Sequence, residues 1–218
     1  MAPAAYKDLC LDAQDPLRLG RFWAGALGLE FVECDDGDAV LRGPTPQHTV
    51  WVNRVPEPRT VKNRMHLDVH ACAVPDLLDL GARVVEEFPR WTVMADPEGG
   101  EFCAFVREEP PEYRLYELVL DATDHRAVGR WWADLLGGRF VDEGKESVSI
   151  TDIPGAPFEY LDVDPVPEPK SAKNRVHLDV VGDAAEIVTR GATLLQKHPE
   201  WDVLADPEGN EFCVFPRS

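Results

Sequence analysis

LCLDAQDPLRLGRFWAGALGLEFVE, residues 9–33, recurs as LVLDATDHRAVGRWWADLLGGRFVD, residues 118–142, and 13 of the 25 aligned positions are identical. Two further stretches repeat in the same order: KNRMHLDV at 62–69 recurs as KNRVHLDV at 173–180, and WTVMADPEGGEFCAF at 91–105 recurs as WDVLADPEGNEFCVF at 201–215. The offset between the copies is 109 to 111 residues, which is far longer than the unit of a solenoid. The repeat therefore indicates a duplicated domain.

The boundary between the two copies is predicted from the composition of the segment that joins them. Residues 107–112, REEPPE, form a charged stretch with two consecutive prolines, which is typical of a short, stiff linker. We therefore expect one domain over residues 1–108 and a second domain over residues 113–218.

The first copy changes from strand periodicity to helix periodicity. Polar and apolar side chains alternate over residues 7–12, which predicts a strand. Asp15 and Pro16 then supply a helix N-cap and a first-turn proline, and Gly28 can end the helix in a left-handed conformation. Between them lies an apolar stripe at helical spacing: Leu19, Phe22, Trp23, Ala26 and Leu27. Short strands are expected next, at residues 30–34, 39–42 and 49–53.

A second cycle of the same elements is expected within each half. In the first half it comprises a strand at 64–70, a short helix at 75–80, a strand at 83–88 and a hairpin of strands at 92–95 and 101–105. The turn residues DPEGG separate the two strands of the hairpin. Each half therefore reads β-α-β-β-β twice, and the whole chain four times.

The composition limits the class of protein and of partner. Lys and Arg number 22 against 40 Asp and Glu, so the formal net charge is −18, which argues against nucleic acid and anionic membrane surfaces as partners. Hydrophobic residues make up 44% of the chain, enough for a packed core, but no apolar run reaches the ~18 residues of a membrane span. Five scattered cysteines without a CxxC pair, and an N-terminus without a secretory-signal pattern, predict a reduced, cytoplasmic protein.

The repeated motifs resemble those of the vicinal oxygen chelate superfamily, which includes glyoxalase I, extradiol dioxygenases, bleomycin-resistance proteins and tandem glyoxalase-like proteins of actinobacterial type. The resemblance rests on the DPLRLGRFWAGALG helix, the HLDV strand and above all the DPEGGEFCAF hairpin, and it covers nearly all of both halves. It implies an α+β fold of two tandem glyoxalase-like domains, each of two βαβββ modules that form a curved mixed-sheet cup.

The resemblance also implies positions for metal ligands, on the first and last strands of the modules. Carried over position by position, the first-strand positions are Asp8 and His66 in the first half and Glu117 and His177 in the second half. The candidate metal ligands are His66 and Glu101 in the first half and His177 and Glu211 in the second half. The position of the superfamily's carboxylate holds a cysteine in both halves, and the two glutamates are the nearest acids, two residues earlier on the same strand face. Two alternatives remain: one divalent ion (Zn, Ni, Mn or Fe) per domain, or no metal and histidines bonded to neighbouring polar groups.

Candidate ligand-binding residues come from the strands and from a repeated basic loop. Trp51, Trp91 and Trp201 lie on expected strands, so they are candidates for the wall of a cup, with core packing as the alternative. The loop V-P-E-P-(R/K)-x-x-K-N-R ends at Arg64 and again at Arg175. These arginines could close over an anionic or carbonyl-rich ligand, or instead pair with carboxylates and pin the loop.

Two functions follow from the resemblance. The first is binding of a small oxygenated or aromatic molecule in the cup, as metabolite binding or as resistance by sequestration. The alternative is a divalent-metal-dependent enzyme of lyase, isomerase or dioxygenase type, in which the ion chelates the substrate. The departure from the superfamily's ligand pattern favours the first function. The expected partner is a small molecule, and a homodimer is compatible with the pattern because such modules also pair between chains.

Overall fold

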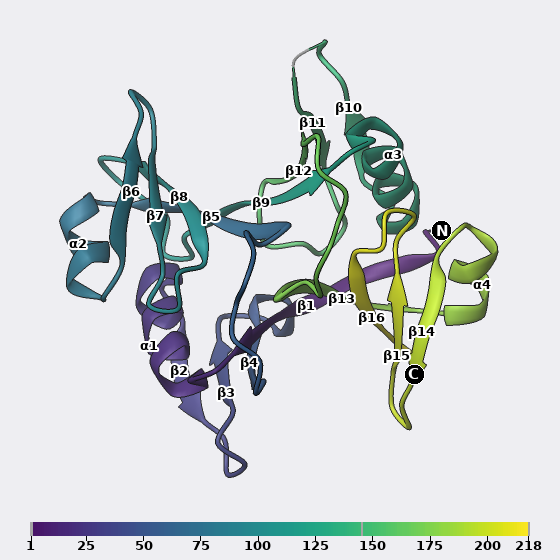
Figure 1. The fold of residues 1–218 in the computed structure, drawn as a ribbon, viewed down its shortest axis with the longest axis horizontal. Coiled ribbons are helices and arrows are strands. Elements are labelled where there is room, and N and C mark those ends of the chain that lie inside the picture. Colours follow the sequence, from purple (N-terminus) through teal and green to yellow (C-terminus); the bar gives the residue numbers. More distant parts are fainter. Residues whose placement is uncertain (1, 145, 218) are drawn as a thin grey trace.

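The computed structural model describes residues 2–144 and 146–217, and its chain runs through four successive βαβββ modules (Figure 1). Module 1 comprises β1 (Ala4–Ala13), α1 (Pro16–Leu27), β2 (Glu30–Glu33), β3 (Ala39–Arg42), the 3₁₀ helix η1 (Pro46–His48) and β4 (Val50–Arg54). Module 2 comprises β5 (Met65–Ala71), α2 (Val74–Asp79), β6 (Arg83–Glu87), β7 (Thr92–Ala95) and β8 (Glu101–Val106).

The second half repeats this order of elements. Module 3 comprises β9 (Leu115–Ala122), α3 (His125–Leu136), β10 (Arg139–Val141), β11 (Val148–Thr151) and β12 (Tyr160–Pro165). Module 4 comprises β13 (Val176–Gly182), α4 (Ala184–Thr189), β14 (Thr193–Lys197), β15 (Asp202–Ala205) and β16 (Glu211–Phe215). No helix among the described residues has the length and apolar character needed to cross a membrane.

The four modules pair into two eight-stranded mixed sheets. Sheet A has the order β14-β15-β16-β13-β1-β4-β3-β2, and sheet B has the order β10-β11-β12-β9-β5-β8-β7-β6. The expected α+β class, the four modules and the mixed sheets of two modules each are therefore confirmed. One feature differs from the expectation that the two modules of one half share a sheet: modules 1 and 4 form sheet A, and modules 2 and 3 form sheet B (Figure 1).

The two modules of each half meet through side chains, whereas the sheets form between the halves. The two modules of the first half meet through side chains, with the rings of Trp23 on α1 and Phe102 on β8 5.2 Å apart. In the second half, Trp132 and Phe212 make the equivalent contact at 5.1 Å. The first strands of the modules pair across the halves, β1 antiparallel with β13 and β5 antiparallel with β9.

The repeated DPEG turn joins the two modules of one half. Asp96 holds the turn, since its Oδ1 accepts hydrogen bonds from the backbone N–H groups of Glu98 and Gly100 at 2.9 and 2.8 Å. The Glu98 carboxylate accepts in turn from the backbone N–H groups of Gln14 and Asp15, just before α1. Glu208 makes the same contacts before α3 in the second half. This explains why the motif occurs twice.

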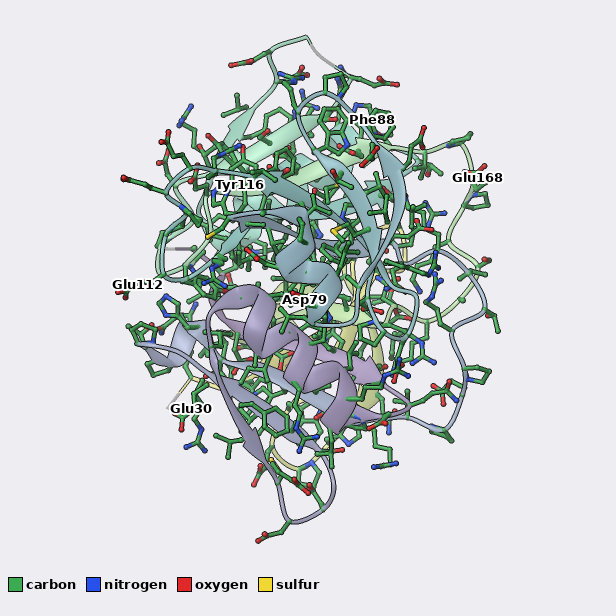
Figure 2. The ribbon with its side chains drawn as sticks, turned by 90° about the vertical axis from the view of Figure 1, so that its left-hand side faces the viewer. Glu30, Asp79, Phe88, Glu112, Tyr116 and Glu168 are labelled. Carbon is green, nitrogen blue, oxygen red and sulfur yellow. The ribbon has the colours of Figure 1, made fainter. Side chains whose placement is uncertain are left out.

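The helix α1 begins and ends where the sequence predicts. Asp15 caps α1 by accepting a hydrogen bond from the backbone N–H of Arg18 at 3.1 Å, and Gly28 ends the helix at a φ of 73°. The apolar stripe of α1 is buried against sheet A and the β8 hairpin. Figure 2 shows α1 and α2 next to each other on one side of the molecule, where the Leu80 side chain approaches Gly25.

Candidate functional site

Each sheet borders a cavity whose lining comes from both halves of the chain. The cavity of sheet A, cup A, has a volume of about 720 Å³ and is lined by residues of β1, β4, β13, β15 and β16. The cavity of sheet B, cup B, has a volume of about 940 Å³ and is lined by residues of β5, β7, β8, β9 and β12. Both volumes are of the size that holds a small organic molecule.

The centre of cup A is built on the paired strands β1 and β13. His177 and Asp179 lie on one face of β13 because side chains alternate along a strand, and His177 Nδ1 is 3.0 Å from Asp179 Oδ1. Cys10 stands directly opposite His177 in the register of β1 and β13, so the two side chains lie on the same face of the sheet. Asn53 on β4 donates from Nδ2 to Cys10 Sγ at 2.8 Å. The four side chains line cup A together as a polar network of two hydrogen-bonded pairs.

Asp8 extends this network along β1 towards an aromatic side chain. It stands opposite Asp179 in the register and accepts a hydrogen bond from Trp51 Nε1 at 3.2 Å. Burial raises the pKa of Asp8 to about 6, although an ion pair with Lys7 at 2.7 Å works in the opposite direction. Asp8 Oδ1 is buried and has no hydrogen-bond partner among the described residues.

Cup B has the same histidine and aspartate but a more acidic centre. His66 Nδ1 lies 2.8 Å from Asp68 Oδ1, and the same oxygen accepts from the backbone N–H of Cys103 at 2.8 Å. Glu117 stands opposite Asp68 in the register of β5 and β9. Burial, followed by repulsion from neighbouring carboxylates of which Asp162 is the strongest, raises the pKa of Glu117 to about 9. At neutral pH the Glu117 carboxyl is therefore protonated and can donate a hydrogen bond.

The two cups differ at the position opposite the histidine. Cys10 faces His177 in cup A, whereas Val119 faces His66 in cup B. Cup B therefore keeps the imidazole–carboxylate pair but has no thiol on the neighbouring first strand.

The two cups also differ on a second strand, which is β4 beside β1 in cup A and β12 beside β9 in cup B. In cup A, β4 carries Trp51 and Asn53, and Trp51 is the register partner of Cys10. In cup B, β12 carries Asp162 and Asp164, and Asp162 is the register partner of Val119. An aromatic ring and an amide in one cup thus correspond to two carboxyl groups in the other, so the cups offer different chemistry to a ligand.

Aromatic rings form one wall of each cup. In cup B the ring centroid of Phe105 is 6.2 Å from that of Trp91 and 5.1 Å from that of Tyr116. In cup A the rings of Trp201 and Phe215 stack at 5.8 Å. Figure 2 marks Tyr116 on the half of the molecule that holds sheet B. The sequence analysis did not single out Tyr116, Phe105 or Phe215, although strand alternation from Cys103 to Phe105 and from Cys213 to Phe215 was a usable signal.

The structure places the three candidate tryptophans at the cups. Trp91 lines cup B, and Trp51 and Trp201 line cup A. Trp51 is 37% exposed, so it faces the open cavity and is not part of the buried core.

The two candidate arginines lie elsewhere. Arg64 and Arg175 line a third cavity of about 600 Å³ between the two repeated loops, and they do not line either cup. The Arg64 guanidinium donates to the backbone carbonyl of Glu168, and that of Arg175 donates to the backbone carbonyl of Glu57. Each loop is thereby tied to the loop of the other half, and the partner is a carbonyl oxygen where the sequence suggested a carboxylate.

The four candidate metal ligands are divided between the cups: His66 and Glu101 line cup B, and His177 and Glu211 line cup A. In cup A the glutamate is already engaged. Glu211 forms an ion pair with Lys170 at 2.8 Å and accepts a hydrogen bond from a backbone N–H at 3.0 Å. A histidine–glutamate pair free to hold a hard divalent ion is therefore not present in cup A.

A different group of donors converges in cup A. One ligand atom each of His177, Asp179 and Cys213 lies within 4.8 Å of the others. Two of these donors are already engaged with each other, because His177 Nδ1 lies 3.0 Å from Asp179 Oδ1. Burial raises the pKa of Cys213 to about 12, so its sulfur is a neutral thiol at neutral pH. The donors do not fit the histidine and glutamate set that the superfamily implies.

Comparison with known proteins supports the fold and its duplication. A family model described as glyoxalase-like domain matches residues 8–105 and again residues 117–215. Glyoxalase I from Zea mays is similar over 98% of this chain and 92% of its own, at 14% identity and a TM-score of 0.70. A putative dioxygenase from Bacillus subtilis subsp. subtilis str. 168 is similar over 99% of this chain and 86% of its own, at 14% identity and a TM-score of 0.67.

The cppA protein from Streptococcus pneumoniae TIGR4 is similar over 98% of this chain and 100% of its own, at 10% identity and a TM-score of 0.55. At these identities the similarity to solved structures concerns the fold alone. No curated protein matches the chain.

Proposed function

Because the chain belongs to the glyoxalase-like domain family, we propose that its two cups bind small oxygenated or aromatic molecules, as a metabolite-binding or sequestering protein. The observation that carries the proposal is the aromatic wall beside a large cavity in each cup, formed by Trp91 and Phe105 in cup B and by Trp201 and Phe215 in cup A. Aromatic walls with a few convergent polar groups are typical of small-molecule sites.

Each cup also offers polar groups suited to oxygen atoms on a ligand. In cup B the protonated Glu117 can donate to a carbonyl or hydroxyl oxygen, and the guanidinium of Arg107 lies 5.7 Å from the Phe105 ring centre at the same cavity. In cup A the ammonium of Lys7 lies 4.1 Å from the Phe215 ring centre. A flat ligand stacked on either wall would therefore have a cationic donor within reach of its edge.

Binding without a resident metal is preferred over the metal-dependent enzyme on the chemistry of the donors. In cup A the carboxylate of Glu211 is held by Lys170, and Nδ1 of His177 is held by Asp179. A divalent ion would have to displace these contacts and remove the proton of a buried thiol. We infer that in cup A polar and aromatic contacts, and not chelation, hold the ligand.

The experiment that tests this function measures ligand binding in the presence of a chelator. A panel of polyoxygenated aromatic compounds is titrated into the full chain with EDTA present, and binding is followed by calorimetry and tryptophan fluorescence. We expect saturable binding that Trp91→Ala weakens in cup B and Trp201→Ala weakens in cup A, because each loses its stacking surface. Trp131→Phe on α3, outside both cups, is the matched control and should bind normally.

The fate of the ligand distinguishes sequestration from catalysis. After incubation and denaturation of the protein, mass spectrometry should recover the ligand unchanged. Binding that disappears with EDTA and returns with Zn²⁺, Ni²⁺, Mn²⁺ or Fe²⁺, together with a changed ligand, would contradict the proposal and support the metal-dependent enzyme. The five cysteines are free of disulfides in the structure, which is compatible with the reducing cytoplasm that we propose as the location.

A further inference from the structure

The third cavity, which we call the loop cavity, is lined by residues of the two repeated loops, 55–64 and 166–175, and by the ends of β1 and β9. Its volume of about 600 Å³ is enough for a small ligand. Both loops begin with V-P-E-P, and the fixed φ of the two prolines restricts the backbone of each. The aromatic walls of the cups lie elsewhere, so ligand binding in the cups leaves this duplicated loop unexplained.

The charge of the loop cavity is opposite to that of the whole chain. Five cationic side chains line it against four acidic ones among the described residues, although the chain has a formal net charge of −18. In the same count, cup A has two cations against six acids and cup B has three cations against six acids. An excess of cations inside so acidic a chain favours an anionic ligand at this place.

The two lysines of the loops are neutralised across the halves. Lys62 forms an ion pair with Asp121 at 2.9 Å, and Lys173 forms the equivalent ion pair with Asp12 at 2.6 Å. Each pair lies at the border between the loop cavity and one cup, because its two residues line both. The lysines therefore do not account for the excess positive charge, which leaves the arginines.

Arg64 and Arg175 carry charges that no carboxylate neutralises among the described residues. Their partners are the backbone carbonyl oxygens of Glu168 and Glu57, which are neutral acceptors. A guanidinium has five N–H donors. Within the described part of the chain, the side chain of Arg64 uses one of them and that of Arg175 uses two. Donors therefore remain on both arginines for a ligand in the cavity.

Both arginines are held in place by the opposite half of the chain. Arg64 reaches from the first loop to Glu168 of the second loop, which Figure 2 labels at the edge of the molecule, and Arg175 makes the reverse contact. Their backbone carbonyls accept hydrogen bonds at 2.7 Å from the N–H groups of Asp121 and Asp12. A fixed side chain loses less entropy on binding, and the planar guanidinium matches the paired oxygens of a carboxylate or phosphate.

We propose that the loop cavity binds a small dianion, with the guanidinium groups of Arg64 and Arg175 on its oxygen atoms. The ligand is a phosphate group or a dicarboxylate, because two arginines supply two positive charges to anionic oxygens. The site is independent of the aromatic walls of the cups and adds a second class of ligand to the molecule. It also explains why the loop occurs twice, since each copy supplies one of the two arginines.

Calorimetric titration of the full chain with sodium phosphate and, separately, with sodium succinate tests this inference. Sodium chloride keeps the ionic strength constant, so that general screening does not register as binding. We expect saturable binding of one dianion per chain, which Arg64→Gln weakens by about 10-fold or more through the loss of charged hydrogen bonds. Arg18→Gln, at an exposed position of α1 outside the loop cavity, is the matched control and should bind as the wild type does.

The two titrations also distinguish the sources of the dianion. Binding of phosphate but not succinate assigns the site to phosphate compounds, and the reverse result assigns it to dicarboxylates. Either result supports the inference when Arg64→Gln weakens it. If the wild type binds neither dianion, the inference is overturned and the arginines serve only to tie the loops together.

Ser171→Asp tests the site without removing a contact between the loops, in case Arg64→Gln does not fold. Ser171 is an exposed residue that lines the loop cavity, so an aspartate there adds negative charge and should weaken dianion binding by about 3-fold or more. Ser147→Asp adds the same charge at cup B and should leave the binding unchanged. Equal binding by the wild type and Ser171→Asp, or an equal loss in Ser147→Asp, would overturn the inference.

Discussion

Glu117 should make the stability of this protein fall as the pH rises, and Glu117→Gln should remove that dependence. The carboxyl is 8% exposed, and burial with neighbouring carboxylates raises its pKa from 4.5 to about 9 in the folded protein. At 1.36 kcal/mol per pKa unit, this difference corresponds to a ceiling of about 6 kcal/mol. Because water entry and relaxation around the charged form reduce the penalty, we expect about 2–4 kcal/mol.

The direction of this pH dependence follows from which state, folded or unfolded, binds the proton of Glu117. The folded protein keeps the proton of Glu117 between pH 4.5 and about 9, whereas the unfolded chain releases it, so unfolding becomes more favourable as the pH rises through this range. The contribution to stability is complete below pH 4.5 and is lost by about pH 9.

Urea unfolding followed by circular dichroism at pH 5, 7 and 9 is the assay for this prediction. Glu117→Gln should lose less stability between pH 5 and pH 9 than the wild type, by about 2–4 kcal/mol. Glu112→Gln, at an exposed position of the linker, is the matched control and should follow the wild type. A folded Glu117→Gln variant with the pH dependence of the wild type would refute the reasoning.

Three further outcomes follow from the contacts between modules. Residues 1–108 and 113–218, produced separately, should each self-associate in light scattering and form one complex when mixed, because the β1–β13 and β5–β9 pairings cross the halves; two stable monomers would contradict this. Phe212→Ala should lower the unfolding free energy by about 3–5 kcal/mol in urea melts, and a loss below 1 kcal/mol would show that its ring contacts with Trp132 matter little. Glu98→Gln should cost about 1–2 kcal/mol by weakening its contacts before α1, and an unchanged midpoint would count against that role.

The order of elements could be predicted from the sequence because its signals are local. The cap at Asp15, the left-handed end at Gly28 and the apolar stripe between them are read within one helix, and the structure has all three. The repeat reveals the duplication in the same way. Which modules share a sheet could not be predicted, since the first strands of all four modules carry similar patterns and the choice of partner depends on contacts between distant residues.

The difference between local signals and contacts of distant residues also decides what could be predicted of the site. The sequence offered Trp91 and Trp201 as candidates for a cup wall, with core packing as the alternative, and in the structure they line the cavities. The role of Arg64 could not be predicted, because its partner is a backbone carbonyl of the other half. The strand face of Cys10 could be predicted, because alternation over residues 7–12 puts it on the same face as Asp8. Its pairing with His177 could not be predicted, because that residue is 167 positions away in the chain, 177 − 10.

The account's central claim, that ligands bind in the two cups, is tested most directly by the six tryptophan indole N–H signals in a ¹⁵N NMR spectrum of the full chain. The tryptophans divide into two sets of three: Trp51, Trp91 and Trp201 line the cups, whereas Trp23, Trp131 and Trp132 lie on α1 and α3. With EDTA present, titration with an aromatic ligand should shift the signals of the cup set and leave the helix set in place. Shifts confined to the helix set, or no shifts at saturating ligand, would contradict the account.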